Sequence, residues 1–332
     1  MKLTLISSSL LAVVAACGSH TPTAQTSSQP AAMAAQSAAL TSIAREELRT
    51  AMEQWHAEAG TVVALDLETG AVLAAIGRNA TGDDDARAAG LPVVTGSTLK
   101  TITHALALDA GVVTPETVLD CRVRTWGDKK IEDSSPHEDL TVREALAVSS
   151  NVCASRLLDK MGFDRWLAGT KKFHLGEAPA TWPTITDGAS FDAAMLAGGE
   201  LGPATAVQLA AAYGVIFRDG NYLPPVAVGA PVGKPEPVVS AATAQTMLGL
   251  LENVITSPNG TGNSAAIPGH KVAGKTGTMP LDDKRNYASF VGRVLDGPKI
   301  VLLVGIVSGD DGAVGGKVAG PAFAKIMQRL MK

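Results

Sequence analysis

The chain has 332 residues, of which 46% are apolar and 18% charged, so it is long enough to bury a sizeable hydrophobic core. Its net charge of −4 is spread without a basic run, which argues against nucleic acid as a partner. The sequence shows no repeat of solenoid period, and we predict one medium-sized globular domain.

The first 17 residues have the pattern of an export signal. Lys2 supplies a positive charge, and residues 3–14 are mainly apolar but too few to span a bilayer. Residues 14–18 resemble a bacterial lipobox, in which Cys17 becomes the lipidated first residue; the alternative is an ordinary secretory signal with an unrelated cysteine. Either segment predicts export, and lipidation would anchor the protein to the membrane, facing the periplasm or cell exterior.

Residues 18–40 are rich in Ser, Thr, Ala, Gln and Pro and lack apolar periodicity, which predicts a flexible tether. The folded domain is expected to span residues 41–332. It should begin with a helix, because Ile43, Leu48 and Met52 recur at helical spacing.

Strand signals lie at the two ends of this domain. Residues 61–67 are β-branched and apolar, and a turn at 68–70 joins them to residues 71–76 in a predicted hairpin. Three more strands are expected at residues 270–278, 287–295 and 299–307. A last helix opens at Pro321. We therefore predict an α+β fold: a five-stranded, mostly antiparallel sheet, with the terminal helices on one face and a helical region over residues 97–251.

Ser97 and Lys100 form an S-x-x-K pattern at the start of a predicted helix whose buried face carries Leu99, Ile102 and Leu106. One-turn spacing places the two side chains together, and the helix N-terminus favours negative charge on the serine oxygen. Burial and the same positive end should lower the pKa of Lys100, so that it can act as the base for a nucleophilic Ser97. The alternative is a helix-start serine beside an unrelated lysine, because one such pattern is expected by chance.

Ser149–Asn151 form the second motif, between two predicted helices, the first of which opens with the capping-box pair Thr141 and Glu144. Ser149 could pass a proton between Lys100 and a leaving amine. Asn151 could hold a substrate amide. Helix capping by Ser and Asn explains the same residues without a function.

Lys275–Thr278 form the third motif, on a predicted strand that could pair with an extended peptide. Gly277 would let that peptide approach closely, and Lys275, Thr276 and Thr278 would bind its terminal carboxylate. The backbone amides of Ser97 and Thr278 could form an oxyanion hole.

Residues 269–276 also match the P-loop pattern G-x-x-x-x-G-K-T. A P-loop follows a buried strand and opens a helix. Here no strand signal precedes the pattern and Pro280 disfavours a helix after it, so we expect no nucleotide partner.

Together the three motifs supply a nucleophile, a base, a proton relay and an anion site, which are the parts needed for serine acyl transfer. On these motifs the chain resembles the penicillin-binding transpeptidases, especially class B members, over residues 41–332. Further matching segments are residues 65–74, 199–208, 260–262, 289–292 and 315–323. The resemblance implies a β-lactamase/transpeptidase-like fold. It also implies a D,D-transpeptidase that acts on peptidoglycan stem peptides through an acyl-enzyme on Ser97, with β-lactams as covalent inhibitors.

The chain departs from that family in three ways. We expect a lipobox-like signal and a short tether where class B members usually have a transmembrane anchor and a large pedestal, and the loop before Ser97 is short. Val94 and Thr95 stand where the family often has an acidic residue and a proline.

Other functions stay open: a D,D-carboxypeptidase, a β-lactamase, or a β-lactam-binding sensor or scaffold without turnover. A β-lactamase needs a deacylating base, and no E-x-x-L-N segment lies between Asn151 and Lys275. The Ser-x-Val pattern of class D enzymes is also missing, because Asn151 stands in place of the valine.

The histidines and cysteines complete the sequence predictions. None of the six histidines has a partner at metal-ligand spacing, so we expect no metal and no cofactor. Cys121 and Cys153 are an even pair in an oxidising compartment, where a bridge can persist. Bridge geometry cannot be read from sequence, and we expect two separate buried thiols.

Overall fold

The computed structural model describes residues 28–81 and 90–332, with the side chains described from residue 31 onward in the first helix. The predicted signal segment and Cys17 lie outside these residues. Within the described part of the chain, no helix is both long enough and apolar enough to span a membrane.

A five-stranded sheet in the order β11-β12-β13-β1-β2 forms the centre of the molecule, and all neighbouring strands are antiparallel. The strands are β1 (Ala59–Asp66), β2 (Val72–Asn79), β11 (Val272–Pro280), β12 (Asn286–Val294) and β13 (Ile300–Ser308). Their positions confirm the five predicted strands. The sheet brings the two ends of the domain together, because β1 pairs with β13.

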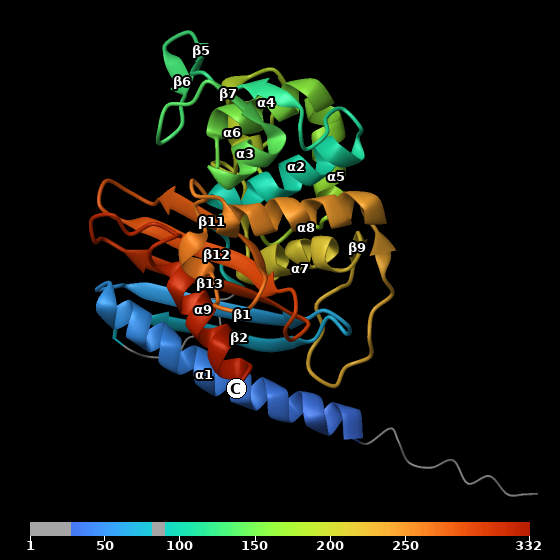
Figure 1. The fold of residues 1–332 in the computed structure, drawn as a ribbon, viewed down its shortest axis with the longest axis vertical. Coiled ribbons are helices and arrows are strands. Elements are labelled where there is room, and N and C mark those ends of the chain that lie inside the picture. The colour runs from blue at the N-terminus through green and yellow to red at the C-terminus, as the bar shows by residue number, and fades with distance from the viewer. Residues whose placement is uncertain (1–27, 82–89) are drawn as a thin grey trace, which may run out of the picture.

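Helices cover both faces of the sheet, as the almost continuous burial of β1 and β13 requires. The terminal helices α1 (Ser28–Gln54) and α9 (Ala319–Leu330) pack together on one face, as predicted (Figure 1). The other face carries α7 (Ala206–Phe217) and α8 (Ala241–Thr256). Strand β11 stays at the edge, with its free side toward the helical region.

The helix α1 begins at Ser28, so the tether predicted over residues 18–40 is wrong from Ser28 onward; residues 18–27 lie outside the described part. Leu40 is fully buried, and the Ser37 hydroxyl donates a hydrogen bond to the Leu73 carbonyl at 2.6 Å. The segment is rich in Ala and Gln, which favour helix, and packing against β2 supplies the rest.

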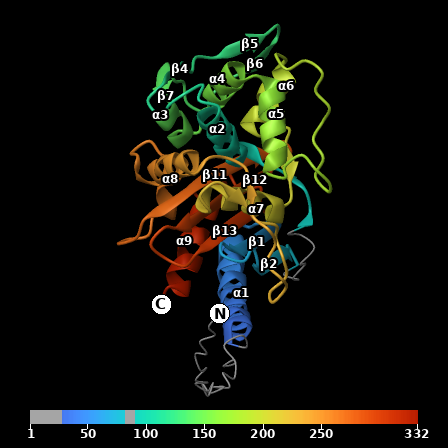
Figure 2. The ribbon, with the colours of Figure 1, turned by 90° about the vertical axis from the view of Figure 1, so that its right-hand side faces the viewer.

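The helical region sits above the β11 edge of the sheet (Figure 2). Its central helix is α2 (Lys100–Asp109), which follows a short 3-10 turn, η2 (Gly96–Leu99), and packs against its neighbours on nearly every side. The surrounding helices are α3 (Val142–Ala147), α4 (Asn151–Met161), α5 (Phe163–Lys172) and α6 (Phe191–Gly198). The predicted helical subdomain is confirmed.

Short antiparallel strand pairs, which the sequence did not predict, decorate this region and the loops around it. They are β3 (Val93–Val94) with β8 (Pro203–Ala204), β4 (Val118–Asp120) with β7 (Asp139–Thr141), β5 (Arg124–Trp126) with β6 (Lys129–Ile131), and β9 (Asn221–Tyr222) with β10 (Glu236–Pro237). A second 3-10 turn, η3 (Asn263–Ala265), precedes β11.

Candidate active site

The nucleophile candidate Ser97 lies in η2, and Lys100 is the first residue of α2. The ammonium nitrogen Nζ of Lys100 donates to Ser97 Oγ at 2.7 Å, which confirms that the two side chains lie together. Ser97 is half-buried, whereas Lys100 is fully buried. The preceding Gly96 has φ +56° and donates its amide to the Gly199 carbonyl at 3.1 Å, so the turn that presents Ser97 is held to the 199–204 segment.

Lys100 is surrounded by oxygen acceptors. Besides Ser97, its Nζ donates to the Ser149 carbonyl at 3.0 Å and to the side-chain oxygen of Asn151. Burial lowers the pKa of Lys100 to about 8, and the charges of Glu200 and Asp133 oppose that fall. A lysine with a pKa near 8 is partly neutral at neutral pH, as a general base must be.

The second motif connects the two lysines of the site. Ser149 has the left-handed φ of +65°, a conformation that non-glycine residues adopt rarely and often at functional sites. Its hydroxyl accepts a hydrogen bond from Lys275 Nζ at 2.8 Å, while its carbonyl accepts from Lys100. The predicted capping box of Thr141 and Glu144 is present at the start of α3.

Asn151 makes two side-chain contacts within the protein. Its oxygen Oδ1 accepts from Lys100, and its nitrogen Nδ2 donates to the Glu132 carbonyl at 3.2 Å. A protonated lysine only donates, so the amide oxygen faces Lys100 in its charged form. The amide is thus already engaged in placing Lys100, and holding a substrate amide stays a prediction.

The third motif lies on the edge strand β11. Lys275 is fully buried, and burial, followed by repulsion from Lys100, holds its pKa well below the usual value. The Thr276 hydroxyl donates to Thr261 Oγ1 at 2.7 Å, and Thr278 Oγ1 accepts from the Gly315 amide at 3.0 Å. Both threonines are therefore oriented by neighbours that the motif did not reveal.

Gly277 is required by close packing. A Cβ there would lie 2.5 Å from Ser289 Oγ and 2.9 Å from Thr98 Cγ2, closer than side chains approach. Thr98 belongs to the first motif, directly after Ser97. The close approach of Gly277 to Thr98 therefore packs the third motif against the first. The P-loop-like residues 269–276 run into β11 instead of opening a helix, as the sequence indicated.

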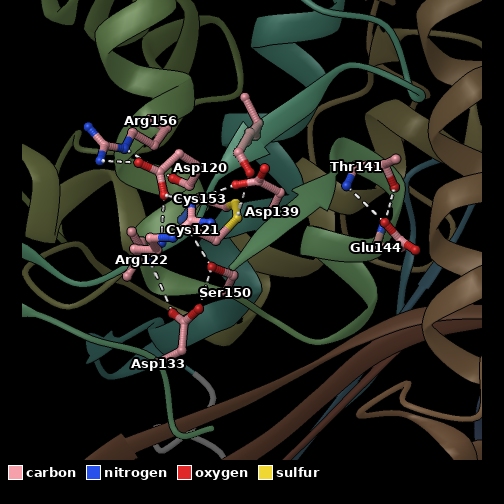
Figure 3. The surroundings of a disulfide bond; sticks show 12 residues. Asp120, Cys121, Arg122, Asp133, Asp139, Thr141, Glu144, Ser150, Cys153 and Arg156 are labelled. Atoms are coloured by element: carbon pink, nitrogen blue, oxygen red, sulfur yellow. Dashed lines mark hydrogen bonds and ion pairs between the residues drawn. A yellow bond between two sulfur atoms is a disulfide. The ribbon is translucent and has the colours of Figure 1, made fainter. Parts of the chain in front are cut away.

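The expectation for the cysteines is wrong: Cys121 and Cys153 form a disulfide, with Cα atoms 5.0 Å apart (Figure 3). The short strand β4, which the sequence did not predict, lies against α4 and carries Cys121 to the first turn of that helix. Cys153 stands in that turn, two positions after Asn151. Nothing local in the sequence indicates this proximity.

Two carboxylates near the site were also not predicted. Asp133 lies in a loop 18 residues before Asn151. Its carboxylate accepts hydrogen bonds from the backbone N–H of Asn151 at 2.6 Å and from the Ser150 hydroxyl at 2.6 Å. The charge of Glu200 reaches Lys100, although its carboxylate has no hydrogen-bond or ion-pair partner among the residues described here. Glu200 lies in a segment that resembles the family. A single acidic residue in that segment does not by itself indicate that it lies near Lys100.

Comparison with known proteins agrees with this geometry. Residues 60–328 match the model of the penicillin binding protein transpeptidase domain, and the chain belongs to this family. It is 31% identical over 315 residues to the probable peptidoglycan D,D-transpeptidase PenA of Neisseria gonorrhoeae, covering 86% of this chain and 54% of that protein. It is 28% identical to the peptidoglycan D,D-transpeptidase FtsI of Escherichia coli strain K12, covering 88% of this chain and 54% of that protein.

The chain thus spans about half the length of these curated relatives. Among solved structures, it is similar to the apo TP domain of Burkholderia pseudomallei penicillin-binding protein 3, with a TM-score of 0.76 and 30% identity. That match covers 87% of this chain and 92% of the other, so the similarity extends over most of both chains.

Proposed function

We propose that this protein is a serine D,D-transpeptidase that acts on peptidoglycan stem peptides through an acyl-enzyme on Ser97. The observation that carries the proposal is the 2.7 Å contact between Ser97 Oγ and the buried Lys100 Nζ. Ser149 and Lys275 continue this contact into a chain of polar groups that ends on the edge strand. Membership of the transpeptidase family and the named D,D-transpeptidase relatives support the same activity.

Acylation follows from these contacts. Neutral Lys100 takes the proton of the Ser97 hydroxyl, and Ser97 Oγ attacks the carbonyl carbon of the penultimate residue of the stem peptide. The C–N bond to the terminal residue breaks, and its amine leaves with a proton delivered through Ser149. An acceptor amine then attacks the ester carbon and gives up a proton, the new C–N bond forms as the C–Oγ bond to Ser97 breaks, and Ser97 regains a proton.

We propose that the substrate binds along the edge strand β11. The free side of β11 can pair with an extended peptide, and Lys275, Thr276 and Thr278 can bind the terminal carboxylate. The amides of Ser97 and Thr278 are proposed to stabilise the oxyanion. β-Lactams, whose ring carbonyl takes the place of the scissile amide, would acylate Ser97 and block it.

Labelling with a fluorescent penicillin tests the nucleophile. We expect the label on the Ser97 peptide by mass spectrometry and none in Ser97→Ala, with both proteins giving the same circular dichroism spectrum. Full-rate labelling of Ser97→Ala would refute the assignment.

Turnover separates the related activities. Release of the terminal residue from a stem peptide should depend on an added amine acceptor for a transpeptidase, but not for a carboxypeptidase. Rapid multiple turnover of a penicillin would indicate a β-lactamase. A stable adduct without any peptide turnover would indicate a sensor or scaffold.

We further propose that the protein is exported and anchored as a lipoprotein through Cys17, on the basis of the lipobox-like residues 14–18. Metabolic palmitate labelling should appear in the wild type and disappear in Cys17→Ala. Failure to label the wild type would favour an ordinary secretory signal.

A further inference from the structure

The first turn of α4 is held by a residue that lies outside the helix. Ser150 is its N-cap and accepts from the Cys153 amide at 2.9 Å, which is a local arrangement. Asp133, in the loop between β6 and β7, completes the cap. Its Oδ1 accepts from the backbone N–H groups of Asn151 at 2.6 Å and Val152 at 3.1 Å, and its Oδ2 accepts from the Ser150 hydroxyl. A carboxylate at this positive helix end is electrostatically favoured.

The loop that carries Asp133 follows the three-residue strands β5 and β6, which project from the helical region (Figure 1). Its apolar support is a small cluster, in which Ile131 packs with Val152 of α4 and Ala194 of α6. Arg124 ties the loop to α4 through the Ser155 hydroxyl at 2.8 Å, and Trp126 donates to the Ala189 carbonyl. The ion pairs of Arg122 with Asp120 and Asp139 are about half exposed, and such pairs contribute little.

The disulfide is the covalent connection between this loop and α4. Cys121 begins the segment that leads to the Asp133 loop, and Cys153 lies in the first turn of α4. Both cysteines are buried. The bridge closes residues 121–153 into a ring that contains both Asp133 and the whole of Ser149–Asn151. Figure 3 shows the bridge beside Ser150 and Asp133. The ring limits how far the second motif and its external cap can separate.

The consequence reaches the nucleophile through one residue. Lys100 Nζ donates to the Asn151 side chain and to the Ser149 carbonyl, both inside the ring, and to Ser97 Oγ outside it. A displacement of the start of α4 would therefore move the Ser149 and Asn151 oxygens, which are two of the three oxygens that accept from Lys100. The third is Ser97 Oγ itself.

We propose that Asp133 and the Cys121–Cys153 disulfide act as one positioning unit, which holds Asn151 against Lys100 in the geometry that acylation of Ser97 requires. This inference rests on the proposed function. Neither part touches the substrate, so both act through Asn151. Because they act on the same contact, the effects of removing them should overlap and not multiply.

The test compares acylation of the wild type, Asp133→Ala, the double variant Cys121→Ala/Cys153→Ala, and the triple variant. The rate constant for fluorescent penicillin is measured across pH, at a temperature where circular dichroism shows each protein folded. We expect each of the first two changes to slow acylation about tenfold or more, since small misplacements of catalytic groups have large effects. The triple variant should be no slower than the slower of the two.

The pH profile distinguishes positioning from general loosening. The groups that face Lys100 are Lys275, Glu200, Asp133 and Asn151, with His104 one turn along α2. The informative protein is Cys121→Ala/Cys153→Ala, which keeps the Asp133 charge: there, loss of the Asn151 acceptor destabilises protonated Lys100, so the acid limb of the profile should move to lower pH. A purely structural role of the bridge would leave that limb in place.

Two control variants match these changes. Asp139→Ala removes a carboxylate from the same segment, but its side chain pairs with Arg122 and not with α4. Ser240→Ala removes the side-chain cap at the start of α8, which lies next to Asp109 at the opposite end of α2 from Lys100, and lowers stability there. Both should acylate at the wild-type rate.

A folded Asp133→Ala or bridge-free protein that acylates at the wild-type rate would overturn the proposal, as would losses that multiply in the triple variant. If the bridge-free protein does not fold, Asp133→Ala, with its bridge intact, decides the question alone. Absence of any adduct on Ser97 in the wild type would instead refute the proposed function.

Discussion

The two sides of the site are held in place by different means. On the sheet side, β11 pairs with β12 along its whole length, from Val272 opposite Val294 to Pro280 opposite Asn286. On the helical side, α4 packs against α2 and α6, and the Asp133 side chain and one disulfide hold its first turn beside the second motif. The hydrogen bonds of a backbone ladder come from main-chain groups that every residue except proline carries in full, whereas a side-chain cap is lost with one substitution. The helical side should therefore be the more easily displaced.

The largest effect should come from the group that joins both sides. Lys100→Met keeps an unbranched side chain in the buried space but removes the amine, so acylation should fall about 10²- to 10⁴-fold. The free energy of unfolding should not fall, because a buried amine is costly to desolvate. Penicillin labelling and thermal denaturation check the two expectations. Labelling above a tenth of the wild-type rate would mean that Lys100 is not the base.

The sheet side should fail only where the backbone itself is displaced. Gly277→Ala places a Cβ 2.5 Å from Ser289 Oγ and 2.9 Å from Thr98 Cγ2, so the two elements must separate. We expect a loss of about 1–3 kcal/mol in the free energy of unfolding and slower acylation, because Thr98 adjoins Ser97. Denaturant titration and labelling measure both.

Gly249→Ala is the matched control for that substitution. Gly249 is exposed in α8, and a Cβ there meets nothing within 4 Å. This change should stabilise the protein by about 0.5–1 kcal/mol and leave labelling unchanged. A Gly277→Ala protein as stable as the wild type would show that the edge strand adapts more easily than the ladder suggests.

Local patterns predicted most of the fold and the core of the site. The five strands, the α3 capping box and the contact between Ser97 and Lys100 all depend on neighbours within a few residues, and the structure confirms them. The three motifs meet because the sheet brings β11 beside η2. That meeting was predictable only through the resemblance to a family.

The missing parts depend on contacts between residues far apart in sequence. Asp133 caps a helix that begins after Ser150, and Cys121 reaches Cys153 by way of the unpredicted strand β4. The start of α1 was missed for a similar reason, since the burial of Leu40 depends on the packing of α1 against the rest of the domain. The composition of that segment, rich in exposed Ala and Gln, does not indicate that the segment packs against β2.

A smaller effect should follow from the charge that faces Lys100 across the site. Glu200 raises the pKa of Lys100 against the larger lowering by burial, so Glu200→Gln should lower that pKa further below about 8. If neutral Lys100 is the base, the acid limb of the acylation profile should move to lower pH. Acylation should then be faster at pH 7 and unchanged near pH 10, where Lys100 is neutral in both proteins. Stopped-flow labelling across pH measures this shift.

Asp133→Asn offers a comparison for that result. It also removes a charge that raises the pKa of Lys100, but it disturbs the cap of α4 as well. The two variants should share the shift of the acid limb and differ in the plateau rate, which should fall only in Asp133→Asn. A limb that moves to higher pH in Glu200→Gln would contradict the assignment of Lys100 as the base.

The smallest effect should come from a cap that lies near the second motif but does not hold it. Thr141 Oγ1 accepts from the Glu144 amide at 3.2 Å, and the Glu144 carboxylate accepts from the Thr141 amide at 2.8 Å. Thr141→Ala should cost about 1 kcal/mol in the free energy of unfolding. Acylation should stay at the wild-type rate, because Asp133 and the disulfide hold Ser150 and Asn151 without help from this cap.

The pH dependence of that stability loss gives an internal check. Hydrogen bonds from Thr141 hold the pKa of Glu144 below its usual 4.5, so their contribution is present above that value and is lost as pH falls through the lower folded value. The stability difference between Thr141→Ala and the wild type should therefore shrink in acid. If acylation instead falls as far as in Asp133→Ala, the whole of α3 positions the second motif. In that case α3 would also belong to the helical side of the site, which side-chain contacts hold in place.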